Sequence, residues 1–193
     1  MSSNSARTEY IESLDSVLNA RGFRRRRSQW EWKYRPDAAN ELWIHINFGK
    51  SVVNPSFGVK YLDLASVLSK ESGAVTGTMV MLSRVLDRPP GYTIEQGSAP
   101  VARDLSAAGL QVLSRLLNRE VVIEMLKSTR PRDWPVVSYS HRIRLLPLLV
   151  ATAGRVAEAL ELLDHYGTES IGRDQSLPQY SFFATTFRKR FAT

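Results

Sequence analysis

The chain has 193 residues, 43% of them hydrophobic and 23% charged, so it is long and apolar enough to bury a core as one domain or one domain with a helical extension. It contains no cysteine, which excludes a disulfide framework and a thiolate zinc site and leaves a reducing compartment, the cytoplasm, as the expected location. The net charge of +7 suits a nucleic acid, an anionic membrane or an acidic protein as partner.

Neither a secretion signal nor a membrane-spanning segment is expected. The N-terminus from Met1 to Arg7 is polar and lacks the apolar core of a signal peptide. The longest apolar run, Leu145 to Ala153, contains Pro147 and is far too short to span a bilayer. The positive charge is denser near the start, since residues 1–62 hold ten Lys or Arg and six Asp or Glu. The four arginines at 24–27 account for this excess.

The first predicted element is an amphipathic helix. Its apolar residues, Ile11, Leu14, Val17 and Leu18, recur at helical spacing. Gly22 then supplies the left-handed conformation that ends many helices, and we expect Phe23 to fold back on Leu18.

Three strands of an antiparallel sheet are predicted next. In residues 30–34 the aromatic side chains alternate with polar ones, which is typical of a half-buried strand. Residues 42–48 show the clearest alternation, and residues 57–61 repeat it after a loop at Gly49 and Asn54-Pro55. On the second strand Trp43 and His45 face away from the apolar side chains.

The remainder turns from mixed to helical. Asp63 can begin a helix that closes near Gly73, whereas the apolar segment 78–86 suits either a fourth strand or a buried helix. Residues 87–104 have the composition of a long loop and form the predicted boundary. Helical spacing follows at residues 105–117, 120–127, 141–153 and 155–166, and the aromatic and basic tail 181–191 is expected to dock.

We therefore predict an α+β fold in which an N-terminal helix packs on an antiparallel sheet of three or four strands and a mostly helical half follows. The predicted sheet domain spans residues 1–86, and the helical half spans residues 105–193. We expect the two to pack as one globular unit.

The first sixty residues resemble a family of small bacterial α+β domains of unknown function, which open with a helix, a Gly-Phe-basic turn and an aromatic strand. The residues that match are Leu18, Gly22, Phe23, Arg24, Arg25, Trp30, Trp32, Ile44, Ile46, Asn47, Phe48, Lys50 and Ser51, followed by Phe57 and Val59. The chain departs from the pattern at Gly49 and in its double tryptophan. Because some similar domains are immunity proteins that accompany bacterial toxins, the resemblance implies an immunity-type or defence-associated interaction protein.

Two interpretations of the arginine run and the aromatic residues stay open. The arginines could neutralise phosphates while Trp30, Trp32, Tyr34 and Trp43 stack on bases, as in proteins that bind single-stranded nucleic acid. Alternatively, the alternating aromatic residues form the buried side of a sheet and the arginines a solvated turn.

No catalytic, cofactor-binding or metal-binding residue is predicted. His141, close to Arg142 and Arg144, could act as the general acid of a nuclease, but no second acid or base is specified near it. The segment 73–77 lacks the Lys and Ser or Thr of a phosphate-binding loop. The acidic residues Glu158, Glu161 and Asp164 have no partner histidines, so they do not specify a metal site and are expected to form a solvated stripe on a helix.

The sequence thus favours a non-catalytic protein-binding module, with a basic nucleic-acid-binding protein as the alternative. A protein partner is expected, a membrane is not, and the oligomeric state is left open. The contacts would involve the basic turn, the exposed sheet face and the loop at 87–104. The predicted partner-binding residues are Arg24, Arg25, Arg26, Arg27, Trp43, His45 and Lys60.

Overall fold

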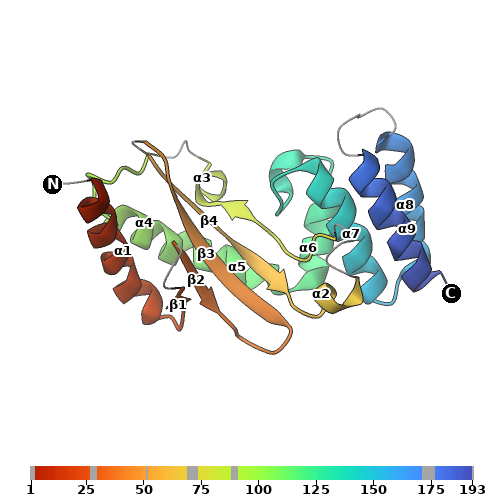
Figure 1. Cartoon of the computed structure of the whole chain (residues 1–193), viewed down its shortest axis with the longest axis horizontal. Coiled ribbons are helices and arrows are strands. Elements are labelled where there is room, and N and C mark those ends of the chain that lie inside the picture. The colour runs from red at the N-terminus through yellow and green to blue at the C-terminus, as the bar shows by residue number, and fades with distance from the viewer. Residues whose placement is uncertain are drawn as a thin grey trace. The chain divides into compact units, whose positions relative to one another are not determined.

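The computed structural model describes residues 3–26, 30–50, 52–68, 74–87, 91–170 and 177–192. The fold is α+β, as predicted: an N-terminal helix, an antiparallel sheet of five strands and a mostly helical C-terminal half (Figure 1). The contacts divide the chain into two units. Unit 1 consists of Met1–Lys60 and Thr78–Leu117, and unit 2 of Tyr61–Gly77 and Asn118–Thr193. The predicted boundary at 87–104 lies inside unit 1.

Helix α1 (Ser3–Asn19) ends where its sequence predicts. Gly22 has a φ of 86°, and its N–H donates to the carbonyl of Asn19 at 3.0 Å. The N–H of Phe23 donates to the carbonyl of Leu18 at 3.1 Å, which completes a Schellman motif. Phe23 and Leu18 are both buried, so the cap also directs the chain into the core.

The sheet is a meander of five strands in the order β1-β2-β3-β4-β5. Its members are β1 (Arg24–Arg25), β2 (Glu31–Tyr34), β3 (Asn40–Phe48), β4 (Val53–Tyr61) and β5 (Val80–Met81). Strands β2, β3 and β4 contain the three predicted ones. The predicted loop at Asn54-Pro55 is wrong, because both residues belong to β4.

The sheet has two further strands, β1 and β5, that the sequence did not clearly predict. Arg24 and Arg25 were expected in a solvated turn, but they pair with Lys33 and Trp32 of β2 as an edge strand. The undecided segment 78–86 holds strand β5 followed by the short helix α3 (Leu82–Val85), so both alternatives are correct for part of it.

One side of the sheet carries the core of unit 1. Trp32, Ile44, Ile46 and Phe57 are fully buried there. Helices α4 (Ala99–Asp104) and α5 (Leu110–Leu116) lie behind the strands in Figure 1, and the π-helical turn η2 (Leu105–Gly109) joins them. A Cβ on Gly109 would lie 3.5 Å from the Phe57 ring, so η2 is packed on this side. The predicted loop at 87–104 is therefore helical from Ala99.

The described residues of unit 2 are mainly helical, although Tyr61 belongs to strand β4. It contains α2 (Leu64–Val67), α6 (Arg119–Lys127), the 3-10 turn η3 (Pro131–Asp133), α7 (Tyr139–Thr152), α8 (Val156–Ser170) and α9 (Leu177–Phe191). The predicted helices at 120–127, 141–153 and 155–166 and the predicted tail correspond to α6 through α9. The helix expected to close near Gly73 ends at Val67 instead, and Gly73 lies outside the described residues.

Helix α7 is the central element of unit 2. All nine of its residues from Ile143 to Ala151 are buried, including Pro147, and the helix contacts α2, α6, α8 and α9. It ends at Thr152, and the φ of 83° at Gly154 allows a second Schellman motif there: Arg155 N–H donates to the carbonyl of Val150 at 3.1 Å. Among the described residues no helix is long and apolar enough to cross a membrane.

Candidate functional site

The side of the sheet opposite the buried core carries polar and aromatic side chains. Along β2, Glu31 and Lys33 alternate with buried Trp32 and therefore lie on this second side. The register of β2 and β3 puts His45 opposite Glu31 and Trp43 opposite Lys33. We call this side the polar face, and its residues are Glu31, Lys33, Glu41, Trp43, His45, Ser56, Gly58, Lys60 and Met81.

The β3–β4 hairpin extends the same rows onto the next strand. Its closing bond runs from Gly49 N–H to the carbonyl of Val52 at 2.8 Å. Counting back along an antiparallel ladder places Ser56 opposite His45 and Gly58 opposite Trp43. The contact of Gly58 with Trp43 agrees, because a Cβ on Gly58 would lie 2.9 Å from Cζ2 of that ring.

Gly58 makes room for two neighbours at once. A Cβ at this position would lie 2.0 Å from the carbonyl oxygen of Thr78, as well as against the Trp43 ring. Thr78 N–H donates to the carbonyl of Val59, and Val59 N–H donates to the Thr78 hydroxyl, so this segment is held tightly against β4. The Trp43 ring therefore packs directly on the backbone of Gly58, at the middle of the polar face.

The acidic side chains of the polar face already have partners. Glu41 accepts from Lys33 Nζ at 2.9 Å and from Arg35 Nε at 3.2 Å, and Glu31 lies 3.7 Å from the same Lys33 Nζ. Burial alone would raise the pKa of the Glu41 carboxyl, but the hydrogen bonds and charges of Lys33 and Arg35 outweigh burial and lower that pKa. Lys60 is exposed. The two lysines and the two glutamates of the polar face therefore balance in charge.

The predicted basic turn is divided by the strand pairing. Arg25 lies opposite Trp32 on the core side, and its Nε contacts Asp15 at 3.0 Å. Arg24 donates to the carbonyls of Asn19 at 3.2 Å and Phe23 at 3.1 Å, next to the end of α1. Arg26 is exposed, and Arg27 lies outside the described residues. Arg25 is thus separated from Trp43, His45 and Lys60 by the sheet.

The predicted aromatic side of the first strand is buried only at its centre. Trp32 is fully buried, whereas Trp30 and Tyr34 are 38% and 37% exposed. Trp30 packs edge-to-face on Phe48 at 5.4 Å, and Tyr34 packs on Phe23 at 5.6 Å. Since Trp43 projects from the other side, the four rings do not form one stacking platform.

His141 does not gain the arrangement that a nuclease would need. The Arg142 guanidinium lies over the Trp134 ring at 4.5 Å and near Tyr166, and its Nε donates to the Leu126 carbonyl at 2.6 Å. Arg144 donates to the carbonyl and hydroxyl of Ser140. Burial, aided by the charge of Arg144, lowers the pKa of His141. Arg142 thus links α7 to α6 and α8, and the bonds from Arg144 to Ser140 lie within α7.

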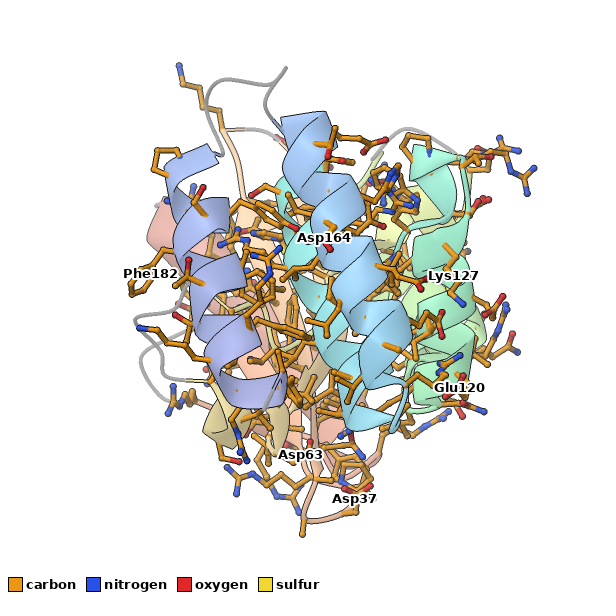
Figure 2. All side chains as sticks on the ribbon, turned by 90° about the vertical axis from the view of Figure 1, so that its right-hand side faces the viewer. Asp37, Asp63, Glu120, Lys127, Asp164 and Phe182 are labelled. Atoms are coloured by element: carbon orange, nitrogen blue, oxygen red, sulfur yellow. The ribbon has the colours of Figure 1, made fainter. Side chains whose placement is uncertain are left out.

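The acidic stripe of α8 is paired with basic side chains. Glu158 accepts from Lys127 at 2.9 Å and lies 3.7 Å from Arg155, while Asp164 contacts Arg188 of α9. Figure 2 shows Asp164 on α8 and Lys127 on α6, on the surface of unit 2 that faces the viewer. No group of His, Asp or Glu residues within the described ranges could hold a metal ion.

One hollow is present on unit 2, between α8 and α9. It has a volume of about 550 Å³ and is lined mainly by small side chains, with the Asp164–Arg188 pair at one end. Gly167, Ala184 and Thr185 are among the small residues that line it. Phe182, labelled in Figure 2, is exposed on α9 but does not line this hollow.

No protein-family model, no curated protein and no solved structure matches the chain. The resemblance of the first sixty residues to small bacterial domains therefore stays a prediction. The residues of the polar face are the basis for inferring a function.

Proposed function

We propose that the chain is a non-catalytic protein-binding module whose partner docks on the polar face of unit 1 around Trp43. The observation that carries this proposal is the position of Trp43, half-buried across Gly58 at the middle of that face. A tryptophan that is already held in place loses little freedom when a partner covers it, which is why such residues dominate binding energies.

The charge of unit 1 supports an acidic protein as the partner. Its two segments contain fourteen Lys or Arg and nine Asp or Glu, a net charge of +5. On the polar face the carboxylates of Glu31 and Glu41 are occupied by Lys33 and Arg35, while Lys60 is exposed. The net positive charge of unit 1 speeds the encounter with a negatively charged protein. An immunity-type or defence-associated role would suit such an interaction.

The test is recovery of a partner from the native host, with nuclease added and with three versions of the full chain. Trp43→Ala should weaken retention of the partner at least tenfold, because a buried aromatic anchor contributes about 2 kcal/mol or more. The matched control is Trp30→Ala, since Trp30 is also an accessible tryptophan of this sheet, 38% exposed, but lies on the core side.

Equal retention by Trp43→Ala and wild type would overturn the location of the site. Equal loss in both tryptophan variants would point to a general effect on folding, which far-UV and near-UV circular dichroism detect directly. In that case Lys60→Glu, a change at an exposed position, provides the test of the same face without a change in packing.

A nucleic-acid-binding function is the second candidate, and the exposure of Arg24, Arg25 and Arg26 favours it. The divided aromatic rings count against a stacking mode, so the binding would be to phosphates and largely independent of sequence. Its test is affinity for a single-stranded and a double-stranded oligonucleotide at 50 and 200 mM salt, where a loss of roughly a thousandfold is expected for six or more phosphate contacts. A flat response to salt would reject it.

A further inference from the structure

The last two helices of unit 2 carry opposite charges. Helix α8 contains four acidic residues and no lysine or arginine, whereas α9 has three basic residues in its last turn and no acidic residue. The two helices are antiparallel neighbours, because Gly167 lies against Tyr180 early in α9 and Asp164 contacts Arg188 late in α9. An acidic helix and a basic helix therefore share one surface of unit 2 (Figure 2).

One exposed face runs along both helices, on either side of the hollow between them. Helical periodicity places Glu161, Asp164 and Thr168 on the same side of α8, and all three are exposed. Ser181 and Thr185 line the hollow from α9, and Lys189 follows Thr185 one turn later. We call this surface the α8–α9 face, and its residues are Glu161, Asp164, Gly167, Thr168, Ser181, Thr185, Arg188 and Lys189.

Two charges of the α8–α9 face have no counterpart in the described part of the chain. Asp164 and Arg188 pair with each other. Glu161 and Lys189 are both exposed, and neither forms a hydrogen bond or an ion pair with a described residue. Glu161 precedes Asp164 by one turn, so the antiparallel contacts place it at the level of the last turn of α9, which contains Lys189.

The arrangement of the charges indicates which surface can cover this face. A partner that carries one sign of charge matches only half of it. A second copy matches both halves if a two-fold axis runs parallel to the helices, because α8 of one copy then lies on α9 of the other at the same level. Glu161 then meets the partner's Lys189, and the axis repeats this contact. A two-fold axis across the helices would place α8 on α8, acid against acid.

We propose that two copies of the chain associate through the α8–α9 face into an antiparallel four-helix bundle, with Glu161 of each copy against the partner's Lys189. The inference concerns unit 2 and does not depend on the binding face around Trp43. The small residues along the hollow allow two pairs of helices to approach closely, and Phe182, 53% exposed on α9, adds apolar contact at the border.

The size of the face predicts a weak dimer. Helices of 15 residues are about 22 Å long, and two of them side by side are about 20 Å wide. A contact of these dimensions buries less than about 1,200 Å² in total, which is typical of weak and reversible complexes. Dissociation constants in the micromolar range are therefore expected.

The test is analytical ultracentrifugation of the full chain from about 5 to 500 µM, the range of weak complexes. The average mass should rise from monomer towards dimer with concentration, and less so at high salt. Glu161→Lys and Lys189→Glu should each raise the dissociation constant about tenfold, because each change replaces attraction by repulsion at two places in the dimer. The double variant restores opposite charges and should return to within about threefold of wild type.

The matched control is Arg190→Glu, which changes the charge as Lys189→Glu does. Arg190 is exposed, but helical periodicity turns it away from the hollow, so its replacement should leave the dissociation constant unchanged. Far-UV circular dichroism checks that every variant is folded. A monomer at all concentrations, a dimer unaffected by both single changes, or a double variant as weak as the single ones would overturn the inference. Equal weakening by Arg190→Glu and Lys189→Glu would also overturn the Glu161–Lys189 contact, because net charge would then explain both.

Discussion

Arg25 and Trp32, paired across β1 and β2, donate to the two oxygens of a single carboxylate, that of Asp15 in α1. The distances are 3.0 Å from Arg25 Nε to Oδ2 and 2.7 Å from Trp32 Nε1 to Oδ1. The edge strand, the second strand and the first helix are therefore linked through one side chain. One member of the arginine run thus contributes to the fold of unit 1.

Replacement of Asp15 by Ala should destabilise the chain, because the buried indole N–H of Trp32 loses its acceptor. The expected cost is about 1–3 kcal/mol in the free energy of unfolding, the range for a buried donor left without a partner. Arg25→Gln should cost less, and Arg26→Gln should change stability by under about 0.5 kcal/mol, as for an exposed side chain without special contacts. Urea denaturation of the three variants measures their free energies of unfolding. Equal losses of stability in all three would contradict the prediction.

Gly58→Ala should be among the most damaging single changes in unit 1. The added methyl group would meet the Thr78 carbonyl at 2.0 Å, so the segment at Thr78 has to move away from β4. We expect a loss of roughly 3 kcal/mol or more, as for severe overpacking. Gly97→Ala is the control, since its φ of 69° is unfavourable for alanine but nothing lies within 4 Å; its cost should stay near 1 kcal/mol. Thermal and urea unfolding compare the two.

Arg142→Lys should weaken unit 2 although the charge is kept. The flat guanidinium stacks on Trp134 at 4.5 Å and donates to the Leu126 carbonyl, and an ammonium group cannot reproduce both contacts. A loss of about 1–2 kcal/mol is expected, the value for a partly desolvated cation–π contact. Arg132→Lys, a change in the short turn η3, should have no effect. Near-UV circular dichroism, which reports on Trp134 and its neighbours, should change only in the first variant.

The chain should become less stable as the pH drops below about 6.5, the ordinary pKa of histidine, because of His141. Burial and Arg144 lower the pKa of His141 in the folded chain, so the unfolded chain binds a proton first as the pH falls. The free energy of unfolding therefore rises with pH between the pKa of His141 in the folded chain and its pKa in the unfolded chain. Above the unfolded value the contribution of His141 is complete. Comparison of urea midpoints at pH 7.5 and 5.5 should show a smaller decrease for His141→Gln than for wild type. Parallel decreases would contradict the assignment to His141.

The end of α1 and the strand with the clearest alternation, both of which local patterns determine, were predicted correctly. Leu18, Gly22 and Phe23 lie next to one another in sequence and contain the whole signal for the end of α1. The alternation in residues 42–48 likewise predicted that Trp43 and His45 share one side of the sheet. These features depend on residues within one or two turns or one strand, so the sequence carries them directly.

The elements that depend on a distant partner were missed. A strand of two residues such as Arg24–Arg25 has no alternation to detect, and only its pairing with β2 decides which arginine faces the core. Asn54-Pro55 suggested a loop, so Ser56 was never assigned to a strand, and its position opposite His45 follows from the hairpin closure between Gly49 and Val52. Strand pairing, which sequence periodicity does not encode, was the missing information.

The outer edge of the sheet at β1 is only two residues long, and both are arginines. An exposed strand edge normally invites a strand of another molecule to add to it, which is how folded proteins begin to aggregate. Here an added strand would have to desolvate two guanidinium groups while gaining very few backbone hydrogen bonds. Arg24 and Arg25 thus protect the sheet from the addition of further strands, so their replacement by valine is expected to shorten the time the concentrated protein stays in solution.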